Sequence, residues 1–583
     1  MPKLTYPEFP VDGLLRTAAE RDPDGLAVRT AGAALSFREL DARADRIAVL
    51  VQQLTDGRPG ARIGVANVLA PAFAAGYYGV LRGGATVVLV NPLIGEDGLR
   101  HVFAASGAEI ALVPAATAGL LAKMRDTLPA LHTIVVTDAP DAVVPPGCVP
   151  LHTALDGMPD TPEPVHADPD AVACVQFTTG TTGRPKGVLL THRNVVANAR
   201  QTSLAHRLGR DSVTVNHLPL YHVMHLNSAL DAGACQVLCQ DPDPLLSLAV
   251  AAGTGATHYY GLPARLHRLA ADGRLAATER AARGGPALTA VLSGGSGLRR
   301  EAARTLRDLL GVPVVQGYGM AELSPLTHCQ QPDRYRPGAV GAPVPGTECR
   351  LVDLTTRRPV DVWSSGEVQV KGPQLMAGYL GEKSCARIDA DGWFSTGDVG
   401  YVDDDGALWL VDRIDDIFKY DNEIVSPSRV EGILAADPRV ADCVVAGWPD
   451  EEHGGLVWAG VVLREGHEGR EGHEGREGRE DREDREGHEG REDREGREGR
   501  EDREDREGHE GREDREDREG HDTSGRPHRI LDVLDSVTAR ANEQLAHFER
   551  IRLTEALDAV ERTPTGKPAR RLIRQRLIQR AAS

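Results

Sequence analysis

The chain of 583 residues lacks several features that define common classes of protein. It has no apolar run of about 18 residues and no basic start leading into an apolar stretch, so neither a membrane span nor a secretory signal is expected. The cytoplasm is therefore the predicted location. Its eight cysteines form no CxxC pair and no zinc-ligand spacing, which predicts reduced, mostly buried thiols. The hydrophobic content of 41% is ordinary for a globular protein with several cores.

An excess of basic charge is also missing. Residues 465–520 contain 26 acidic residues and 14 arginines, a net charge of −12. The other 527 residues carry 60 acidic and 53 basic residues, a net charge of −7. This balance is unremarkable for an enzyme and does not favour nucleic acid as a partner.

A low-complexity insert at 465–521 is built from EGRE, EGHE and EDR units of Glu, Asp, Arg, Gly and His. Without an apolar residue it cannot bury a core, so a disordered or transiently helical segment is predicted. Its histidines stand singly among Glu and Arg, which favours a solvated linker over a metal-binding tract. Loop-closure entropy grows slowly with length, so a surface loop tolerates such an insert.

The most informative segment is FTTGTTGRPKG, residues 177–187. Its glycines let the backbone approach an anion, its hydroxyls can donate hydrogen bonds, and its lysine adds positive charge. The spacing differs from GxxxxGK[ST], which excludes a Walker-type motor or kinase. An apolar run at 171–177 predicts a buried strand, and residues 187–200 predict a strand edge followed by a helix. An ordinary Gly/Thr turn is the alternative to a phosphate-binding loop. The candidate phosphate ligands are Thr178, Thr179, Gly180, Thr181, Thr182, Gly183 and Lys186.

Five further segments follow this loop in an order and spacing that resemble the adenylate-forming superfamily of acyl-CoA synthetases, firefly luciferases and peptide-synthetase adenylation domains. The resemblance extends from LSFRELDARADRIA at 35–48 to RTPTGKPARR at 562–571 and leaves only the insert outside. The family's loop is TSGTTGxPKG, and Thr179 keeps the hydroxyl of its serine position.

The resemblance implies an α/β fold in two parts. A large N-terminal adenylation domain of layered sheets and helices would span 1–411, and a small α+β mobile domain would span 417–583. Residues 412–416 would form the hinge, with Asp415 in the hinge position. Apolar β-branched runs that alternate with helical stretches support the layered α/β arrangement.

The implied activity is ATP-dependent activation of a small-molecule carboxylic acid. The acid would displace pyrophosphate to form an acyl-adenylate, and the acyl group would then pass to coenzyme A. In QGYGMAE at 316–322, Tyr318 would stack on adenine and Glu322 would help to hold Mg²⁺. Ala321 replaces the usual threonine, so one hydroxyl contact to the α-phosphate would be missing.

Two further residues would bind the ribose. Asp398 in STGDVG can accept hydrogen bonds from both ribose hydroxyls, and Arg413 would reach the same sugar. An interdomain salt bridge is the alternative role for Arg413. Outside the loop, the implied ATP-binding residues are Gly317, Tyr318, Gly319, Met320, Ala321, Glu322, Asp398, Arg413 and Lys567.

The principal catalytic candidate is Lys567 in TPTGKPARR, which matches the lysine that bridges the substrate carboxylate and the nucleotide. In the resembling enzymes the small domain rotates after adenylation and withdraws this lysine. Lys419 matches a lysine of the second, thiol-transfer face, although a merely solvated role is equally open. Asn422 and Arg429 stand where the family has glycine and glutamate, and these departures leave open an acceptor other than coenzyme A. The implied catalytic residues are Lys567, Glu322, Lys186, His222 and Lys419.

The acid pocket would be lined by HLPLYHVMHLNSAL at 217–230 and by residues near VLSGGSGL at 291–298. His222 holds the family's pocket-histidine position, whereas a structural role is equally open for His225 and Asn227. These side chains favour a compact aryl or functionalised acid over a long fatty acid. The predicted pocket residues are His222, His225, Asn227, Tyr260, Gly294 and Gly295.

Two alternatives remain at this point. In the first, the enzyme keeps adenylation but passes the acyl group to a carrier-protein thiol or another nucleophile. In the second, the protein is a non-catalytic scaffold that binds nucleotide or acyl-adenylate. The presence of Lys186, Glu322, Asp398 and Lys567 argues against the scaffold.

Overall fold

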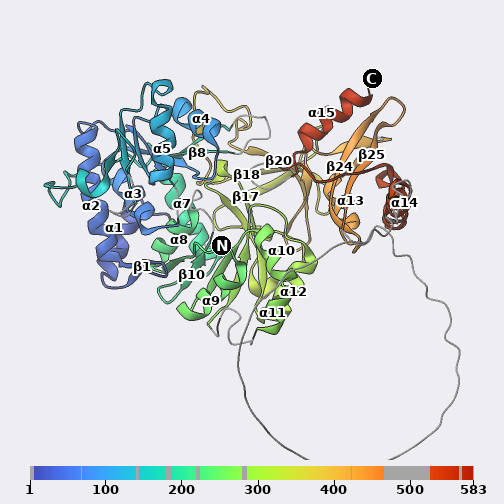
Figure 1. Ribbon diagram of the computed structural model, residues 1–583, viewed down its shortest axis with the longest axis horizontal. Helices are drawn as coiled ribbons and strands as arrows, with labels where there is room; N and C mark the ends of the chain where they lie inside the picture. Colours follow the sequence, from blue (N-terminus) through green and yellow to red (C-terminus); the bar gives the residue numbers. More distant parts are fainter. Residues whose placement is uncertain are drawn as a thin grey trace, which may run out of the picture.

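The computed structural model describes residues 5–66, 69–138, 144–178, 185–217, 223–278, 285, 287–421, 423–464, 526–562 and 568–581. A large domain, blue to yellow in Figure 1, runs to strand β21 (Leu408–Arg413), and a smaller orange-red domain follows. The α/β fold expected from the sequence is confirmed. The predicted hinge residues 412–416 cover the end of β21 and the turn before β22 (Phe418–Tyr420).

The first sheet of the large domain has eight strands, and most of its pairs are parallel. All five residues of TVVLV in its β4 are buried, because an inner parallel strand is covered on both faces. The last two strands, β9 and β19, pair antiparallel at one edge. In spatial order the strands are β19 (Gly378–Tyr379), β9 (Gly187–Thr191), β8 (Val172–Phe177), β4 (Thr86–Val90), β3 (Arg62–Ala66), β5 (Ile110–Val113), β6 (Thr133–Val136) and β7 (Val149–Pro150).

The second sheet has nine strands, with a parallel centre and antiparallel additions at both ends. Its central strands all direct their carboxyl ends to one edge, where β13 and β14 lead into the predicted site. The spatial order is β16 (Ala342–Pro343), β15 (Leu326–Cys329), β14 (Val314–Gly319), β13 (Ala290–Ser293), β12 (His258–Gly261), β10 (Val213–Asn216), β11 (Cys235–Leu238), β1 (Leu26–Arg29) and β2 (Ala34–Ser36).

Helices cover and separate these sheets. At the start of α7, Thr191 Oγ1 accepts a hydrogen bond from the Asn194 N–H, and Asn194 Oδ1 accepts one from the Thr191 N–H, which closes a capping box. The α-helices of the large domain are α1 (Asp12–Arg21), α2 (Phe37–Leu54), α3 (Pro71–Arg82), α4 (Glu96–Ser106), α5 (Ala115–Lys123), α6 (Leu151–Ala154), α7 (His192–Ala205), α8 (Met224–Ala232), α9 (Pro244–Thr254), α10 (Pro263–Ala271), α11 (Gly273–Ala277) and α12 (Arg300–Leu310). Short 3₁₀ turns are η1 (Arg125–Thr127), η3 (Ala321–Leu323) and η4 (Pro332–Arg334).

A third, antiparallel sheet of four strands completes the large domain. Side chains from all three sheets, including Val87, Val28 and Phe394, share one buried core with α2 and α3. The sheets are thus rigidly connected where they meet the predicted site. The strands are β17 (Glu348–Val352), β18 (Gly366–Lys371), β20 (Phe394–Val402) and β21.

The small domain has its own core, in which α13 and α14 pack on a three-stranded sheet. Helix α15 packs on the same sheet through Ile573 and Leu577. The sheet contains β24 (Val440–Asp450), β25 (Gly454–Leu463) and β26 (Ile551–Ala556), and a hairpin is formed by β22 and β23 (Glu423–Val425). The helices are α13 (Pro427–Leu434), α14 (Arg526–Gln544), η5 (His547–Glu549) and α15 (Arg570–Ala581).

The predicted insert at 465–521 lies between β25 and α14, outside the described residues. Among the residues that are described, no helix is long and apolar enough to cross a lipid bilayer.

Candidate active site

Three of the predicted nucleotide residues meet across the gap between two sheets. Tyr318 near the end of β14 donates a hydrogen bond from its hydroxyl to Asp398 Oδ2 on β20, at 2.5 Å. Arg413 on β21 approaches the other carboxylate oxygen, with 3.2 Å between Nη1 and Oδ1. Asp398 and Arg413 face each other in the β20–β21 ladder, so strand pairing sets their distance. The structure thus joins segments that are about 80 residues apart in the sequence.

This carboxylate is held in a buried setting. Asp398 is only 8% exposed, and its backbone N–H donates to Thr396 Oγ1. Burial raises the pKa of Tyr318 well above its usual value, and the neighbouring Asp398 charge adds to the shift, so the phenol stays a hydrogen-bond donor. The Nε of Arg413 is buried and has no hydrogen-bond partner within the described part of the chain. A buried donor in this state is a candidate ligand-binding group.

The segments that flank the phosphate loop form a hairpin. Strands β8 and β9 confirm the predicted strand and strand edge, and the Thr178 N–H donates to the Lys186 carbonyl at 2.9 Å. Lys186 Nζ lies 2.8 Å from Glu382 Oε1 and 4.7 Å from the centre of the Tyr379 ring. The remaining loop candidates, Thr179, Gly180, Thr181, Thr182 and Gly183, lie outside the described residues.

Glu322 lies in η3 and is 7% exposed. Its Oε1 accepts a hydrogen bond from the Tyr379 hydroxyl at 2.8 Å, and its carbonyl accepts one from Met376 N–H at 2.9 Å. Tyr379 therefore connects Glu322, through its hydroxyl, with Lys186, through its ring. Burial, followed by the Glu322 charge, raises the pKa of Tyr379, which keeps the phenol protonated.

The glycines of QGYGMAE are needed for the close approach of two chain segments. A Cβ at Gly319 would stand 1.9 Å from the Pro325 carbonyl oxygen, and one at Gly317 would stand 3.0 Å from Leu326 Cδ1. Met320 N–H donates to the same Pro325 carbonyl at 3.0 Å. Ala321 follows at the start of η3 with 8% exposure. The motif therefore shapes the turn that presents Glu322.

The predicted acid pocket is only partly described. Gly294 and Gly295 follow the carboxyl end of β13, and Gly295 has a φ of +90°. His225 on α8 lies against Tyr260 of β12, with 4.1 Å between ring centres. Asn227 is 1% exposed and is bonded to two tyrosines of α3, accepting from Tyr78 at 2.6 Å and donating to Tyr77 at 3.2 Å. His222 lies outside the described residues.

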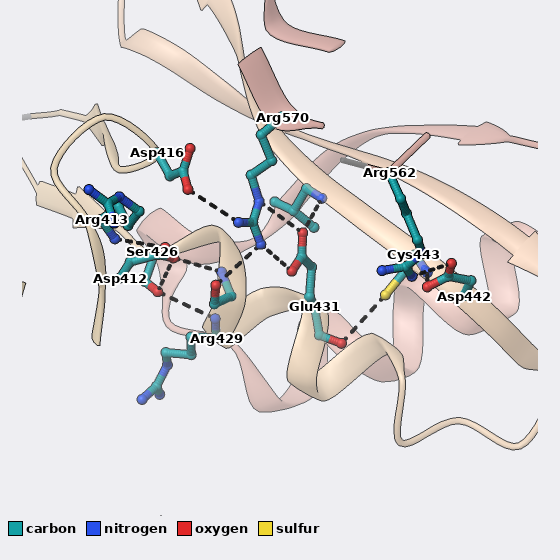
Figure 2. Close-up of polar contacts among 12 residues, drawn as sticks. Asp412, Arg413, Asp416, Ser426, Arg429, Glu431, Asp442, Cys443, Arg562 and Arg570 are labelled. Atoms are coloured by element: carbon teal, nitrogen blue, oxygen red, sulfur yellow. Dashed lines mark hydrogen bonds and ion pairs between the residues drawn. The ribbon is translucent and has the colours of Figure 1, made fainter. Parts of the chain in front are cut away.

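A charged network surrounds the predicted hinge (Figure 2). Arg570, the first residue of α15, reaches Glu431 of α13 through two nitrogens and approaches Asp416 Oδ2 at 3.3 Å. Its Nη2 also donates to Ser428 Oγ at 3.2 Å. Burial raises the pKa of both Glu431 and Asp416, and the Arg570 charge opposes that shift in each case.

On the large-domain side of the hinge, Asp412 Oδ2 accepts hydrogen bonds from Ser426 Oγ and Ser428 N–H, each at 2.9 Å. These bonds tie the end of β21 to the start of α13. Asp415 itself is exposed, and its carbonyl accepts a bond from Arg574 at 3.4 Å. Lys419 is exposed on β22.

Lys567 lies outside the described residues, but the chain on both sides of it is placed. Ala569 N–H donates to the Glu561 carbonyl at 2.8 Å, and Arg562 and Pro568 form an isolated antiparallel bridge. The residues that flank the segment 563–567 are therefore held next to each other. Arg570, which contacts Glu431 and Asp416, follows directly after Ala569.

Arg429, which stands where the family has glutamate, has an ion-pair partner within the small domain. Arg429 Nε lies 2.9 Å from Glu549 Oε1, whose side chain is 6% exposed. A glutamate at 429 would place two carboxylates in contact. The second departure, Asn422, lies outside the described residues.

Sequence reasoning missed Tyr379, Glu382, Asp412, Glu431 and Arg570. Asp412 lies in the predicted hinge and Arg570 in RTPTGKPARR, but no motif residue indicated the side chains that they contact around the hinge. The other three lie outside the quoted motifs, and their partners are distant along the chain. Tyr379 carries one indirect signal, because β19 pairs with β9, the strand that follows the phosphate loop. That pairing is itself a tertiary feature.

In the described parts of the chain, no cluster of three or more His, Cys, Asp or Glu side chains could hold a metal by itself. Glu322 thus stands as a single buried carboxylate. Such an arrangement suits Mg²⁺, which is commonly bound by one or two carboxylates together with substrate phosphates.

Comparison with known proteins places this geometry in a family. A model of the AMP-binding enzyme family matches residues 15–380. A long-chain-fatty-acid–CoA ligase of Bacillus subtilis is 29% identical over 80% of this chain and 87% of its own length. The 4-coumarate–CoA ligase 2 of Oryza sativa subsp. japonica is 30% identical over 77% of this chain and 82% of its own. A feruloyl-CoA synthase of Amycolatopsis sp. is 30% identical over 77% of this chain and 87% of its own length.

Solved structures agree on the fold. An anthranilate CoA ligase, AuaEII, in complex with anthranoyl-AMP gives a TM-score of 0.78 at 21% identity and covers 99% of both chains. ATP-bound MatB from Rhodopseudomonas palustris gives 0.77 at 23% identity and covers 97% of this chain and 99% of its own.

The chain belongs to the AMP-binding enzyme family. The predicted superfamily and class of activity, an AMP-forming acid–CoA ligase, are confirmed by these relatives.

Proposed function

We propose that this enzyme activates a compact aryl acid with MgATP, releases pyrophosphate, and transfers the acyl group from the adenylate to the thiol of coenzyme A. The observation that carries the proposal is the convergence of two arrays at one edge of the sheets: Tyr318 with Asp398 and Arg413, and Glu322 with Tyr379 and Lys186. The first array suits a nucleoside and the second suits its phosphates.

Asp398 is suited to a ribose because its two oxygens can accept from adjacent hydroxyls in addition to the bonds from Tyr318 and Arg413. Tyr318 supplies an aromatic face for adenine. The unpartnered Arg413 Nε adds a positive donor at the same place. The ion pair of Arg413 with Asp398 stays within the large domain, so an interdomain salt bridge is not needed to account for this arginine.

Glu322 would hold Mg²⁺, which neutralises phosphate charge when bound. One oxygen of Glu322 is oriented by Tyr379, which leaves the second for the metal. Lys186 would bind the phosphates that leave as pyrophosphate. In doing so it would exchange Glu382, an exposed partner, for the stronger charge of the nucleotide.

Lys567 would bridge the acid carboxylate and the nucleotide, and His222 would line the acid pocket. Both roles rest on the sequence motifs. The hinge at 412–416 would let the small domain withdraw Lys567 and present Lys419 for the thioester step. Arg429 is satisfied by Glu549, so this departure from the family pattern does not favour a carrier protein over coenzyme A.

An aryl acid is favoured by the aromatic wall of His225 and Tyr260 and by the relatives that act on 4-coumarate and ferulate. The Bacillus relative acts on long-chain fatty acids, which makes chain length the point to test. Pyrophosphate release from MgATP should be measured with benzoic, hydroxycinnamic, short-chain and long-chain acids, with and without coenzyme A, and the products identified by mass. Release that depends on an aryl acid and yields its acyl-CoA is expected. Release with long-chain acids alone would refute the aryl assignment, and no release with any acid would refute the ligase.

The role of Lys567 is tested by Lys567→Ala. We expect acid-dependent pyrophosphate exchange to fall by about 10²- to 10³-fold while ATP still binds, because a preorganised charge at the reacting centre is lost. Lys123→Ala, which changes an exposed lysine at the end of α5, is the matched control and should retain full exchange. Unchanged exchange in Lys567→Ala would remove this residue from the mechanism.

A further inference from the structure

A cavity of about 390 Å³ lies at the amino ends of the central strands of the nine-stranded sheet, opposite the edge that carries the nucleotide residues. Its rim includes the exposed residues Arg207 and Asp211. Its inner end is formed by His206, Leu292 and Val315, which are 7%, 7% and 1% exposed. None of these residues belongs to the predicted nucleotide or acid site.

The cavity and the predicted acid pocket lie along the same face of this sheet. Side chains alternate between the two faces of a strand, so Leu292 and Gly294 share one face of β13 and its extension, about 7 Å apart. Leu292 lines the cavity, whereas Gly294 is a predicted pocket residue. The cavity and the predicted acid pocket are therefore neighbours along β13.

Tyr260 stands between these two spaces. It is 2% exposed and packs with Ala290, Leu292 and Val315, all three of which line the cavity. Its ring lies against His225 of α8, on the acid-pocket side. Its hydroxyl bonds to His206 Nδ1 at 3.0 Å, on the cavity side. A single side chain thus contacts the lining of both spaces.

His206 is itself fixed in place. It follows the last residue of α7, and its carbonyl accepts a bond from His258 Nε2 at 2.9 Å. His258 lies on the same face of β12 as Tyr260 and lines the cavity. His206 therefore holds the tyrosine hydroxyl from the cavity side, and His258 in turn holds His206.

We propose that Tyr260, held by His206, is the far wall of the acid pocket and limits the length of the acid, and that the cavity behind it receives the tail of a longer acid when the ring is removed. The inference rests on the proposed function and deepens it, because it assigns the preference for compact acids to one residue. Tyr260 is a specificity determinant here and takes no part in the chemical step.

The test compares the wild type with Tyr260→Ala on a series of ω-phenylalkanoic acids from benzoic to 6-phenylhexanoic acid, with pyrophosphate release as the readout. In the wild type, kcat/KM is expected to fall steeply as the chain lengthens. In Tyr260→Ala, the ratio of kcat/KM for a longer acid to that for benzoic acid should rise roughly fourfold for each methylene group that the cavity buries, or more than tenfold for two.

Tyr259→Ala is the matched control, because it removes the same side chain from the opposite face of β12, where Tyr259 packs in a separate core. It should lower stability without changing the chain-length profile. Leu292→Ala removes another side chain that packs with Tyr260 and lines the cavity. It replaces Tyr260→Ala in the test if that variant does not fold.

The outcomes separate the two proposals. An unchanged chain-length profile in the folded opening variants, with a wild type that activates benzoic acid, would overturn the inference and leave the ligase assignment in place. A profile that broadens equally in Tyr259→Ala would also overturn it, because the effect would then be general loosening. A wild type that releases no pyrophosphate with any acid would overturn both.

Discussion

Several buried histidines of the large domain are held in the neutral form. His192, His217 and His328 are 4%, 5% and 0% exposed. Burial lowers the pKa of His192 to about 4 and of both His217 and His328 to about 3, because the imidazolium loses its hydration. His192 also accepts a hydrogen bond at Nδ1 from Val11 N–H, at 3.1 Å, which the charged ring cannot do.

These histidines should make the fold sensitive to mild acid. Their folded pKa lies below the unfolded value of about 6.5, so the unfolded chain binds more protons and stability is lost as the pH falls from about 6.5 towards about 4. At about pH 5, His192 alone should lower the free energy of unfolding by on the order of 2 kcal/mol. His192→Asn keeps an acceptor without the titration, so between pH 7 and pH 5 it should lose on the order of 1–2 kcal/mol less stability than the wild type in urea unfolding. Equal losses in both proteins would contradict this explanation.

At the scale of elements, the hinge is organised by the first turns of two helices. Asp412 satisfies the start of α13, where a carboxylate is favoured by the helix dipole. Arg570 begins α15, where a cation is disfavoured, and Glu431 and Asp416 compensate for that placement. The arginine side chain is 14% exposed, so its loss would leave two poorly hydrated carboxylates.

Arg570 is therefore predicted to be a positioning residue. Arg570→Ala should destabilise the small domain by about 3 kcal/mol and reduce acid-dependent pyrophosphate release, because the start of α15 loses its anchor three residues after Lys567. Arg574→Ala, one turn further along α15 and exposed, is the matched control and should change either quantity little. Thermal unfolding and pyrophosphate release measured on both variants check this. Similar behaviour of the two would show that the network around Arg570 has no special role.

At the scale of the whole molecule, the two domains have separate cores and meet at the hinge (Figure 1). In the sequence, the low-complexity insert falls between β25 and α14 of the small domain. Nothing in its composition supplies apolar surface for packing.

Replacing residues 465–521 with a Gly/Ser linker of about 14 residues should leave pyrophosphate release unchanged. Two halvings of loop length alter closure entropy by only about 1 kcal/mol, in the stabilising direction. A Gly/Ser segment of the original length separates the effect of length from that of composition. A loss of activity above about tenfold with an intact fold would assign the insert a function.

Local structure near the phosphate loop was predictable because hydrophobic periodicity acts over short distances. The buried strand, the strand edge and the helix expected between 171 and 200 appear as β8, β9 and α7. Element ends were less accurate. The strand expected at 171–177 begins at Val172, and the helix within the predicted segment 187–200 continues to Ala205.

The candidate site divides in the same way. Tyr318, Asp398 and Arg413 carry recognisable motifs, and the structure brings them into contact, while their roles toward ATP remain predictions. Tyr379 and Arg570 could not be found beforehand, since each matters only through partners that lie about 57 to 193 residues away.

The sequence by itself determined the family, the class of chemistry and the layered α/β plan, because motif residues and apolar periodicity are properties of short segments. The tertiary structure alone decided which side chains orient Glu322, Lys186 and the start of α15, and which residue stands between the acid pocket and the cavity behind it. Those relations depend on sheet order and on helix packing, which bring together segments whose spacing along the chain carries no signal.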